Sequence, residues 1–170
     1  EGAQAVFQEL SSTPTNVADA NSNITYGSLP GHKTTTVDAI RAYVQSNLNS
    51  LHETWIALPK ELWLPEWHKR GYVRPMVRLV KALYGHPEAG AYWEERVDKH
   101  FKAVGFESMN PEWPSCYFHI QLKIYCVVYV DDFKISGPID NIPKAWELIK
   151  QGLVIEPPKR IDEKGIIFLG

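Results

Sequence analysis

The 170-residue chain has little cysteine and no histidine pair at a metal-binding spacing. Its two cysteines, Cys116 and Cys126, fall on neighbouring expected strands, and so sparse a pair is typical of a domain from a reducing compartment. None of the six histidines belongs to a His-x-x-x-His pair, so the sequence indicates no zinc site. The longest apolar run is seven residues, which is too short to span a membrane.

The chain also lacks a strong excess of charge and a signal peptide. The formal net charge of −2 argues against a protein whose whole surface binds nucleic acid, but it leaves room for a local basic patch. No basic segment followed by an apolar one opens the chain, so we expect an intracellular protein, in a cytoplasmic particle or the nucleus, with no membrane partner. Because the chain begins without methionine, we expect a piece of a longer protein.

Two adjacent carboxylates, Asp131 and Asp132, follow the apolar residues 124–130, which are typical of a buried strand. Strand propensity resumes at residues 133–136, so the two aspartates are predicted to form the tip of a tight hairpin. A carboxylate pair at such a tip is costly unless a cation neutralises it, and a divalent metal ion is the obvious candidate. Asp-Asp is also an ordinary turn dipeptide, so the pair alone leaves both interpretations open.

The remaining pattern predicts an α+β fold. Residues 8–36 are rich in Ser, Thr, Asn, Gly and Pro, which predicts a loop-rich segment with short strands at 24–26 and 34–37. Apolar periodicity predicts a helix from Ala39, with Asp38 as its N-cap. Two stronger helices are predicted over residues 87–104 and 143–153, and residues 62–67 are expected to be irregular. Further strands or extended segments are predicted at 54–58, 72–80, 116–120, 124–130 and 166–169.

The order strand, helix, hairpin, helix predicts a split βαβ, ferredoxin-like arrangement, which is an antiparallel sheet with helices on one face. In that arrangement the end of the first strand, at Asp38, lies beside the hairpin of Asp131 and Asp132. Three carboxylates meeting at the edge of a sheet suit hard cations such as Mg²⁺. Two such ions can support an in-line phosphoryl transfer.

A basic run lies between the predicted strands and the long helix. Its cations are spread over thirteen residues and alternate with apolar side chains: Lys69, Arg70, Arg74, Arg78 and Lys81. Phosphates of a nucleic acid are one partner for such a run. An ordinary solvated face is the commoner explanation, and charge alone favours it.

Four short blocks of sequence, taken together with their order, resemble a known family. They are Val37-Asp38-Ala39-Ile40-Arg41-Ala42-Tyr43, then Lys81-Ala82-Leu83-Tyr84-Gly85 leading to Trp93, then Tyr129-Val130-Asp131-Asp132, and finally Phe168-Leu169-Gly170. Together they resemble the reverse transcriptase domain of copia-type LTR retrotransposons. The resemblance implies a ferredoxin-like polymerase palm over residues 37–170, truncated before the thumb and RNase H regions. Residues 1–36 would be a loop-rich remnant of the fingers.

The resemblance also implies an activity, RNA-directed DNA polymerisation, with two Mg²⁺ ions or Mn²⁺ as cofactor. Its partners would be an RNA or DNA template–primer, deoxynucleoside triphosphates and the rest of a Gag-Pol-type polyprotein. Asp38, Asp131 and Asp132 would be the catalytic, metal-binding carboxylates. The basic run would bind nucleic acid.

The substrate-binding residues follow from the same resemblance. Tyr43 would be the steric gate that excludes a ribose 2′-hydroxyl, and Ala42 would border the nucleotide pocket. Tyr129 and Val130 would contact the substrate, with Val130 at the primer end. Without the resemblance, Tyr43 is an aromatic residue on a predicted helix face, and such residues are more often part of a core.

One departure from the family bears on activity. His86-Pro87-Glu88 stands where the family usually has Leu-Lys-Gln, whose Gln contacts the incoming nucleotide. Glu88 at this substrate position would face a triphosphate unfavourably, so either the contact is remodelled or activity is impaired. A degenerate palm that only binds nucleic acid is therefore a second hypothesis. A metal-dependent phosphohydrolase is a third, which is disfavoured because no further acidic or histidine ligands have an evident place.

Overall fold

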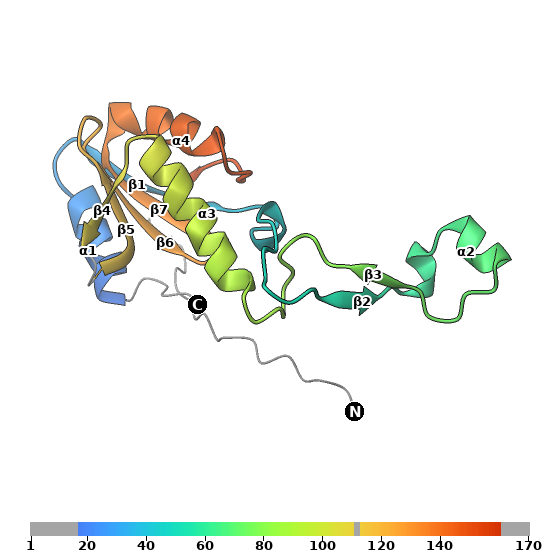
Figure 1. Cartoon of the computed structure of the whole chain (residues 1–170). Coiled ribbons are helices and arrows are strands. Elements are labelled where there is room, and N and C mark those ends of the chain that lie inside the picture. The colour runs from blue at the N-terminus through green and yellow to red at the C-terminus, as the bar shows by residue number, and fades with distance from the viewer. Residues whose placement is uncertain (1–16, 111–112, 161–170) are drawn as a thin grey trace.

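The computed structural model describes residues 17–110 and 113–160 of the chain. Figure 1 shows a body built around one sheet, with a long arm that projects away from it. All neighbouring strands of the sheet are antiparallel, and their order is β4-β5-β6-β7-β1-β8. The predicted α+β class with an antiparallel sheet is therefore confirmed.

The sheet combines segments that are far apart in the sequence. Its strands are β1 (His32–Asp38), β4 (Glu107–Asn110), β5 (Trp113–His119), β6 (Ile124–Tyr129), β7 (Asp132–Pro138) and β8 (Lys159–Arg160). Helix α3 (Ala89–Ala103) precedes β4, and helix α4 (Ile142–Lys150) connects β7 to β8. The central order β8-β1-β7-β6 is the one that a split βαβ arrangement requires.

Helices α3 and α4 cover one face of the sheet and form the main core with it. The predicted apolar stripe of α3 is confirmed, because Trp93, Val97 and Phe101 are all buried. The Phe101 ring stacks against that of Phe133 from β7, with centroids 6.0 Å apart. Each such side chain contributes roughly 1.5–3 kcal/mol by leaving water. This packing supports β7, which begins at Asp132.

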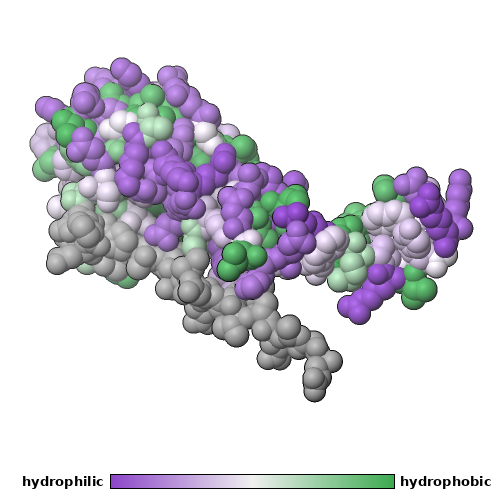
Figure 2. All heavy atoms as spheres, viewed as in Figure 1, coloured by the Kyte–Doolittle hydropathy of each residue, from purple (hydrophilic) through white to green (hydrophobic). Residues whose placement is uncertain are grey.

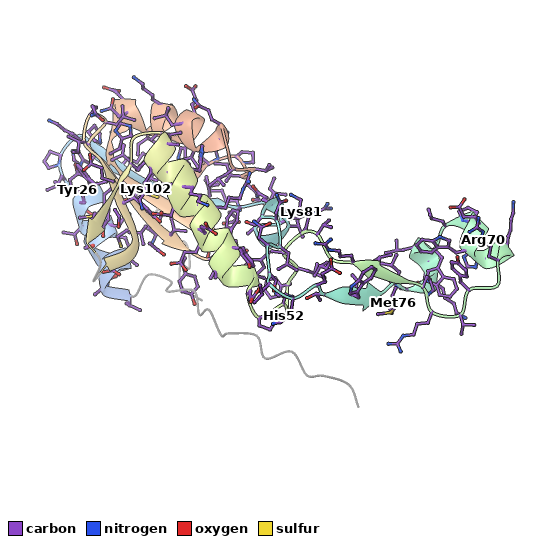
Figure 3. The ribbon with its side chains drawn as sticks, viewed as in Figure 1. Tyr26, His52, Arg70, Met76, Lys81 and Lys102 are labelled. Carbon is purple, nitrogen blue, oxygen red and sulfur yellow. The ribbon has the colours of Figure 1, made fainter. Side chains whose placement is uncertain are left out.

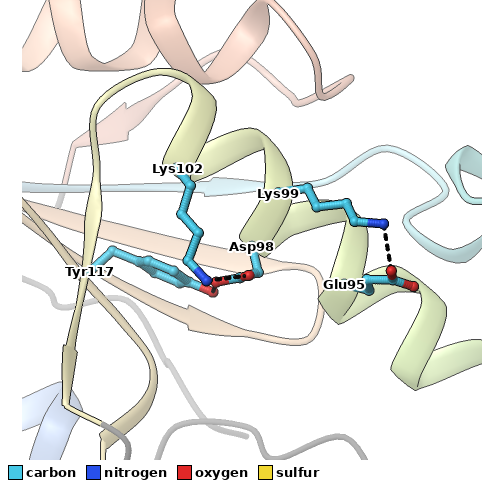
Figure 4. A network of polar contacts seen from close by, with 5 residues as sticks. All are labelled: Glu95, Asp98, Lys99, Lys102 and Tyr117. Carbon is cyan, nitrogen blue, oxygen red and sulfur yellow. Dashed lines mark hydrogen bonds and ion pairs between the residues drawn. The ribbon is translucent and has the colours of Figure 1, made fainter.

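The solvent side of α3 carries charged pairs one turn apart. Lys99 pairs with Glu95, and Lys102 pairs with Asp98 at 2.7 Å (Figure 4). Each exposed pair contributes only a few tenths of a kcal/mol. The Tyr117 hydroxyl of β5 donates to Asp98 at 3.5 Å, and burial, followed by the charge of Asp98, raises the pKa of Tyr117. The helix is thus tied to the sheet by both apolar and polar contacts.

Helix α1 (Val17–Gly27) lies on the opposite face of the sheet. The Asn23 amide donates to the carbonyl oxygen of Tyr125 at 2.9 Å, and the Ser136 hydroxyl donates to Asn23 at 2.7 Å. The strand predicted at 24–26 and the loop predicted for residues 17–27 are therefore wrong. The prediction that helices cover only one face of the sheet is wrong too. Its polar residues favour turns locally, but here the sheet satisfies their hydrogen bonds.

Strand β1 includes the predicted strand at 34–37, and it runs across the boundary that we expected between residues 36 and 37. The helix predicted from Ala39 is wrong, since only a single 3₁₀ turn, η1 (Tyr43–Gln45), forms there. Ala39 bridges to Ile155, and Arg41 has a φ of 53°, which no α-helix allows. Asp38 is consequently the last residue of a strand and not a helix cap.

The arm is a two-stranded ribbon with a helical tip. It comprises β2 (Trp55–Ala57), η2 (Lys60–Leu62), α2 (Pro65–Lys69) and β3 (Met76–Arg78). The extended segments predicted at 54–58 and 72–80 are confirmed in β2 and β3, whereas the short helix α2 was not predicted within residues 62–67. Figure 2 shows hydrophilic and apolar residues mixed along the arm. No helix in the described ranges is long and apolar enough to cross a membrane.

The remaining expectations concern the second half of the chain. The hairpin of β5 and β6, the hairpin of β6 and β7 and the helix α4 are confirmed. Strand β4 was not predicted. The strand expected at 166–169 and the block at residues 168–170 lie outside the described residues.

Candidate active site

The predicted carboxylates meet at one end of the two central strands. The hairpin between β6 and β7 turns on Val130 and Asp131, one residue earlier than predicted, because Asp132 already pairs with Tyr129 as the first residue of β7. On the other side of β7, Asp38 is the register partner of Asp132. The backbone N–H of Ala39 donates to the carbonyl oxygen of Asp131 at 2.7 Å. The antiparallel pairing of β1 with β7 thus brings Asp38 beside Asp132 and the turn that carries Asp131.

This end of the sheet is strongly negative. Partial burial, followed by the charges of Asp131 and Asp38, raises the pKa of Asp132 to about 6, while Lys159 opposes the shift. Lys134, two residues further along β7, is 2% exposed. Its burial lowers the pKa of the Lys134 ammonium, and Asp132 opposes this. Sequence reasoning missed both lysines. The closeness of Lys159 to the carboxylates arises from the pairing of β8 with β1, whereas Lys134 lies on the same strand and face as Asp132.

Lys159 on β8 forms ion pairs with Asp38 and with Glu156. Its ammonium donates to Oδ2 of Asp38 at 2.9 Å and lies 2.9 Å from Oε2 of Glu156. The hydrogen bond to Asp38, then that to Glu156, raises the pKa of Lys159. A positive charge therefore already compensates part of the carboxylate cluster. The two-residue strand that places it is too short to be predicted from periodicity.

The side chains of Asp38, Asp131 and Asp132 have suitable chemistry for a hard divalent cation, although they do not converge on one point in this structure. Within residues 17–110 and 113–160, no three His, Cys, Asp or Glu side chains are arranged to hold a metal ion. Asp38 is turned to Lys159 instead. The donors are carboxylate oxygens only. After burial, the charges of Asp131 and Asp38 also raise the pKa of Asp132, and a cation would relieve that repulsion. Both properties fit Mg²⁺ or Mn²⁺.

The turn that carries Asp131 has a strained backbone. Val130 has a φ of 54°, and Asp131 is not among the residues with positive φ. Positive φ at the first central residue only is the pattern of a type II′ hairpin turn, where Gly is the usual residue. A β-branched residue in this region costs about 1–3 kcal/mol and persists only where its surroundings hold it. The Trp93 indole N–H donates to the Val130 carbonyl oxygen at 2.6 Å.

A cavity of about 310 Å³ lies beside the turn. Such a volume is within the range of small-molecule pockets. Ala42, Tyr43, Val130 and Asp131 of the predicted set line it, together with Arg41, Val44, Leu83 and Tyr84. The rings of Tyr43 and Tyr84 are 4.9 Å apart. Burial, then Tyr84 and Asp131, raises the pKa of Tyr43. Tyr84 was not predicted as a site residue, although it belongs to the block at residues 81–85.

Glu88 does not line this cavity. It is buried directly before α3, where it accepts a hydrogen bond from the Tyr92 hydroxyl at 3.4 Å. Its backbone N–H donates to Nδ1 of His86 at 3.2 Å. The contact between Glu88 and a triphosphate stays a prediction, and in this structure the Glu88 side chain is bonded to Tyr92. Tyr129 is partly buried at the end of β6 and also lies outside the residues that line the cavity.

The predicted basic run follows the arm and does not surround the carboxylates. Its five side chains are exposed: Lys69, Arg70, Arg74, Arg78 and Lys81. Arg70 lies near the far end of the arm, and Lys81 lies close to the body (Figure 3). Arg78 pairs with Glu53 at 3.0 Å, and Lys81 donates to Asn47 at 2.7 Å. The charges nearest to the tip are thus the ones most available to a partner.

Exposed apolar side chains accompany these cations. Trp55, which is 52% exposed, is the register partner of Arg78 on the ribbon. Aromatic rings beside cations are typical of surfaces that stack bases and bind phosphates.

A comparison of the chain with known protein-family models finds no family that matches.

Proposed function

We propose that this chain is part of an RNA-directed DNA polymerase of the copia type. The sheet with α3 and α4 would be its palm, and the arm would be part of its fingers. The observation that carries the proposal is the pairing of Asp38 with Asp132 beside a cavity lined by Tyr43. A turn alone would not require a third carboxylate on a neighbouring strand. The order of the sequence blocks supports the same reaction.

The residues of the site would divide the work as follows. Asp38, Asp131 and Asp132 would hold the cation, which when bound activates the primer 3′-hydroxyl and stabilises the leaving oxygens. The Tyr43 ring would lie where a ribose 2′-hydroxyl would project and exclude it by steric clash. Tyr84, whose ring is 4.9 Å away, would offer a second aromatic surface for the nucleotide.

The arm would hold the nucleic acid. Lys69, Arg70 and Arg74 are exposed around its tip, where they would neutralise backbone phosphates. Each neutralised phosphate makes binding more sensitive to salt. We assign the fingers role to the arm in place of residues 1–36, because α1 packs against the same sheet that carries the carboxylates.

Primer extension tests the proposal directly. We expect Asp131→Asn to lower Mg²⁺-dependent extension of a DNA primer on an RNA template by at least about a hundredfold. Asp140→Asn is the matched control, because Asp140 is an exposed aspartate in η3 (Ile139–Asn141), which follows the opposite end of β7 from the turn. Undiminished extension by Asp131→Asn would rule out the assigned site.

A catalytically inactive palm that only binds nucleic acid is the second candidate. The ion pair between Lys159 and Asp38 favours it, because it occupies an oxygen that a metal ion would need. Template–primer affinity and nucleotide incorporation separate the two functions. The second candidate predicts salt-dependent binding with no incorporation at any Mg²⁺ or Mn²⁺ concentration.

A further inference from the structure

The Val130-Asp131 turn is held at its two consecutive carbonyl groups by hydrogen bonds from two different parts of the chain. The Trp93 indole N–H of α3 donates to Val130 O at 2.6 Å, and Ala39 N–H, just after β1, donates to Asp131 O at 2.7 Å. Val130, the first of the two residues whose carbonyl groups are bonded, has a positive φ of 54°. A β-branched residue leaves that conformation readily unless contacts hold it. The two hydrogen bonds therefore oppose relaxation of the turn, in addition to the pairing of Tyr129 with Asp132 across it.

Trp93 is well placed to act as a fixed support. Its side chain is 2% exposed within the core between α3 and the sheet. Its ring meets that of Phe133 edge to face, with centroids 6.4 Å apart. Phe133 directly follows Asp132, and Val130 directly precedes Asp131. Trp93 thus contacts the chain on both sides of the two aspartates.

We propose that Trp93 is a positioning residue whose indole N–H holds Val130 in its strained conformation and thereby places Asp131 and Asp132 beside Asp38. Trp93 acts through the backbone and contacts none of the three carboxylates through its indole N–H. The effect on metal binding and catalysis rests on the proposed function. The effect on the turn itself does not.

A small cavity explains why loss of the N–H need not unfold the protein. It measures about 20 Å³ and is lined by Trp93, Tyr43 and Val130 among others. That is enough for one water molecule, which could bond to the Val130 carbonyl in a variant without the indole. A water molecule satisfies the carbonyl but does not fix its position. We therefore expect Trp93→Phe to fold with a turn that is free to relax.

Trp146 provides a matched control. It is also a buried tryptophan on the helical face of the sheet, and its indole N–H donates to Oγ1 of Thr35 on β1 at 3.0 Å. Trp146→Phe removes a hydrogen bond from the same core without touching the turn. A purely structural role for Trp93 predicts that the two variants behave alike.

Hydrogen exchange at the Ala39 amide is the first measurement, because its acceptor is Asp131 O. We expect Trp93→Phe to speed this exchange at least about tenfold relative to Trp146→Phe when both are compared with their global unfolding. Replacing Val130 by Gly, the usual residue at this turn position, removes the strain and should restore protection in the Trp93→Phe chain. Unchanged exchange at Ala39 in Trp93→Phe would overturn the proposal.

Titration with Mn²⁺ alone is the second measurement. We expect Trp93→Phe to weaken Mn²⁺ binding about tenfold, as loss of a residue that orients a ligand usually does, and Trp146→Phe to leave it within about twofold. Equal affinities in the two variants would overturn the claimed effect on the carboxylates. If the unsubstituted chain binds no Mn²⁺ while Ala39 responds as expected, the proposed function fails and the role of Trp93 in the turn stands.

Discussion

Replacing Asp132 by Asn should stabilise the fold at neutral pH, because Asp132 is ionised there in surroundings that disfavour charge. Partial burial is the largest cause, and the neighbouring charges of Asp131 and Asp38 add to it. Lys159 offsets part of this cost. Asn has nearly the same shape as Asp, keeps a polar side chain beside Asp38 and removes the charge.

The size of the effect follows from the pKa. Raising the pKa of Asp132 from its ordinary value of 3.8 to about 6 corresponds to about 3 kcal/mol between the protonated and ionised forms. Solvent reaches Asp132 and screens its interactions, so we expect a gain of only about 1 kcal/mol for Asp132→Asn at pH 7. This gain is a sizeable share of the stability of an ordinary domain.

The pH dependence has a definite sign. The folded protein binds the Asp132 proton more tightly than the unfolded chain does. Protonation of Asp132 therefore stabilises the unsubstituted protein fully below pH about 4, and this contribution is lost as the pH rises to about 6. The difference between Asp132→Asn and the unsubstituted chain should therefore be small at pH 4 and constant above pH about 7.

Urea unfolding of both proteins between pH 4 and 8 measures this difference. Asp140→Asn serves again as the control, since Asp140 is exposed. The reasoning would be refuted if Asp132→Asn were no more stable than the unsubstituted chain at pH 7. A gain that did not shrink toward pH 4 would equally contradict it.

Three further predictions concern the ion pair, the cavity and the packing of α1. Lys159→Met should strengthen Mn²⁺ binding several-fold by calorimetry, because it frees Asp38 from a competing cation, and weaker binding would contradict this. Tyr43→Val in an extending chain should raise ribonucleotide incorporation, and no rise would mean that Tyr43 is not the gate. Gly27→Ala should destabilise the fold by about 1–3 kcal/mol in urea, because the added Cβ would lie 1.9 Å from Oγ1 of Thr34. Thr34→Ala in the same chain should recover part of that loss, and no recovery would indicate another cause.

Local pattern was sufficient for the elements whose packing follows from their own periodicity. The stripe of α3 and the apolar strand β6 bury the side chains that their spacing predicts. The hairpin of β6 and β7 was predicted because strand propensity stops and resumes near Asp131 and Asp132, although the observed turn lies one residue earlier, at Val130 and Asp131. Once this order of elements was interpreted as a split βαβ arrangement, the position of Asp38 beside the hairpin followed, and the structure adds its register with Asp132.

Local pattern failed where distant groups satisfy a segment. Helix α1 looks like a loop because Asn23 favours turns, yet the sheet accepts and donates its hydrogen bonds. The segment after Asp38 has helical periodicity, but its backbone bonds to Asp131 and bridges to Ile155. In both places contacts between distant residues outweigh propensities of less than 1 kcal/mol per residue.

The carboxylate pair could thus be predicted from the sequence, because adjacent aspartates after an apolar run remain adjacent in any fold. The side chains that surround the pair could not be predicted. The ion pair of Asp38 with Lys159 joins residues 121 positions apart, and the hydrogen bond from Trp93 to Val130 joins residues 37 positions apart. Such contacts depend on which strands pair and which helix covers them, and no local period encodes that choice.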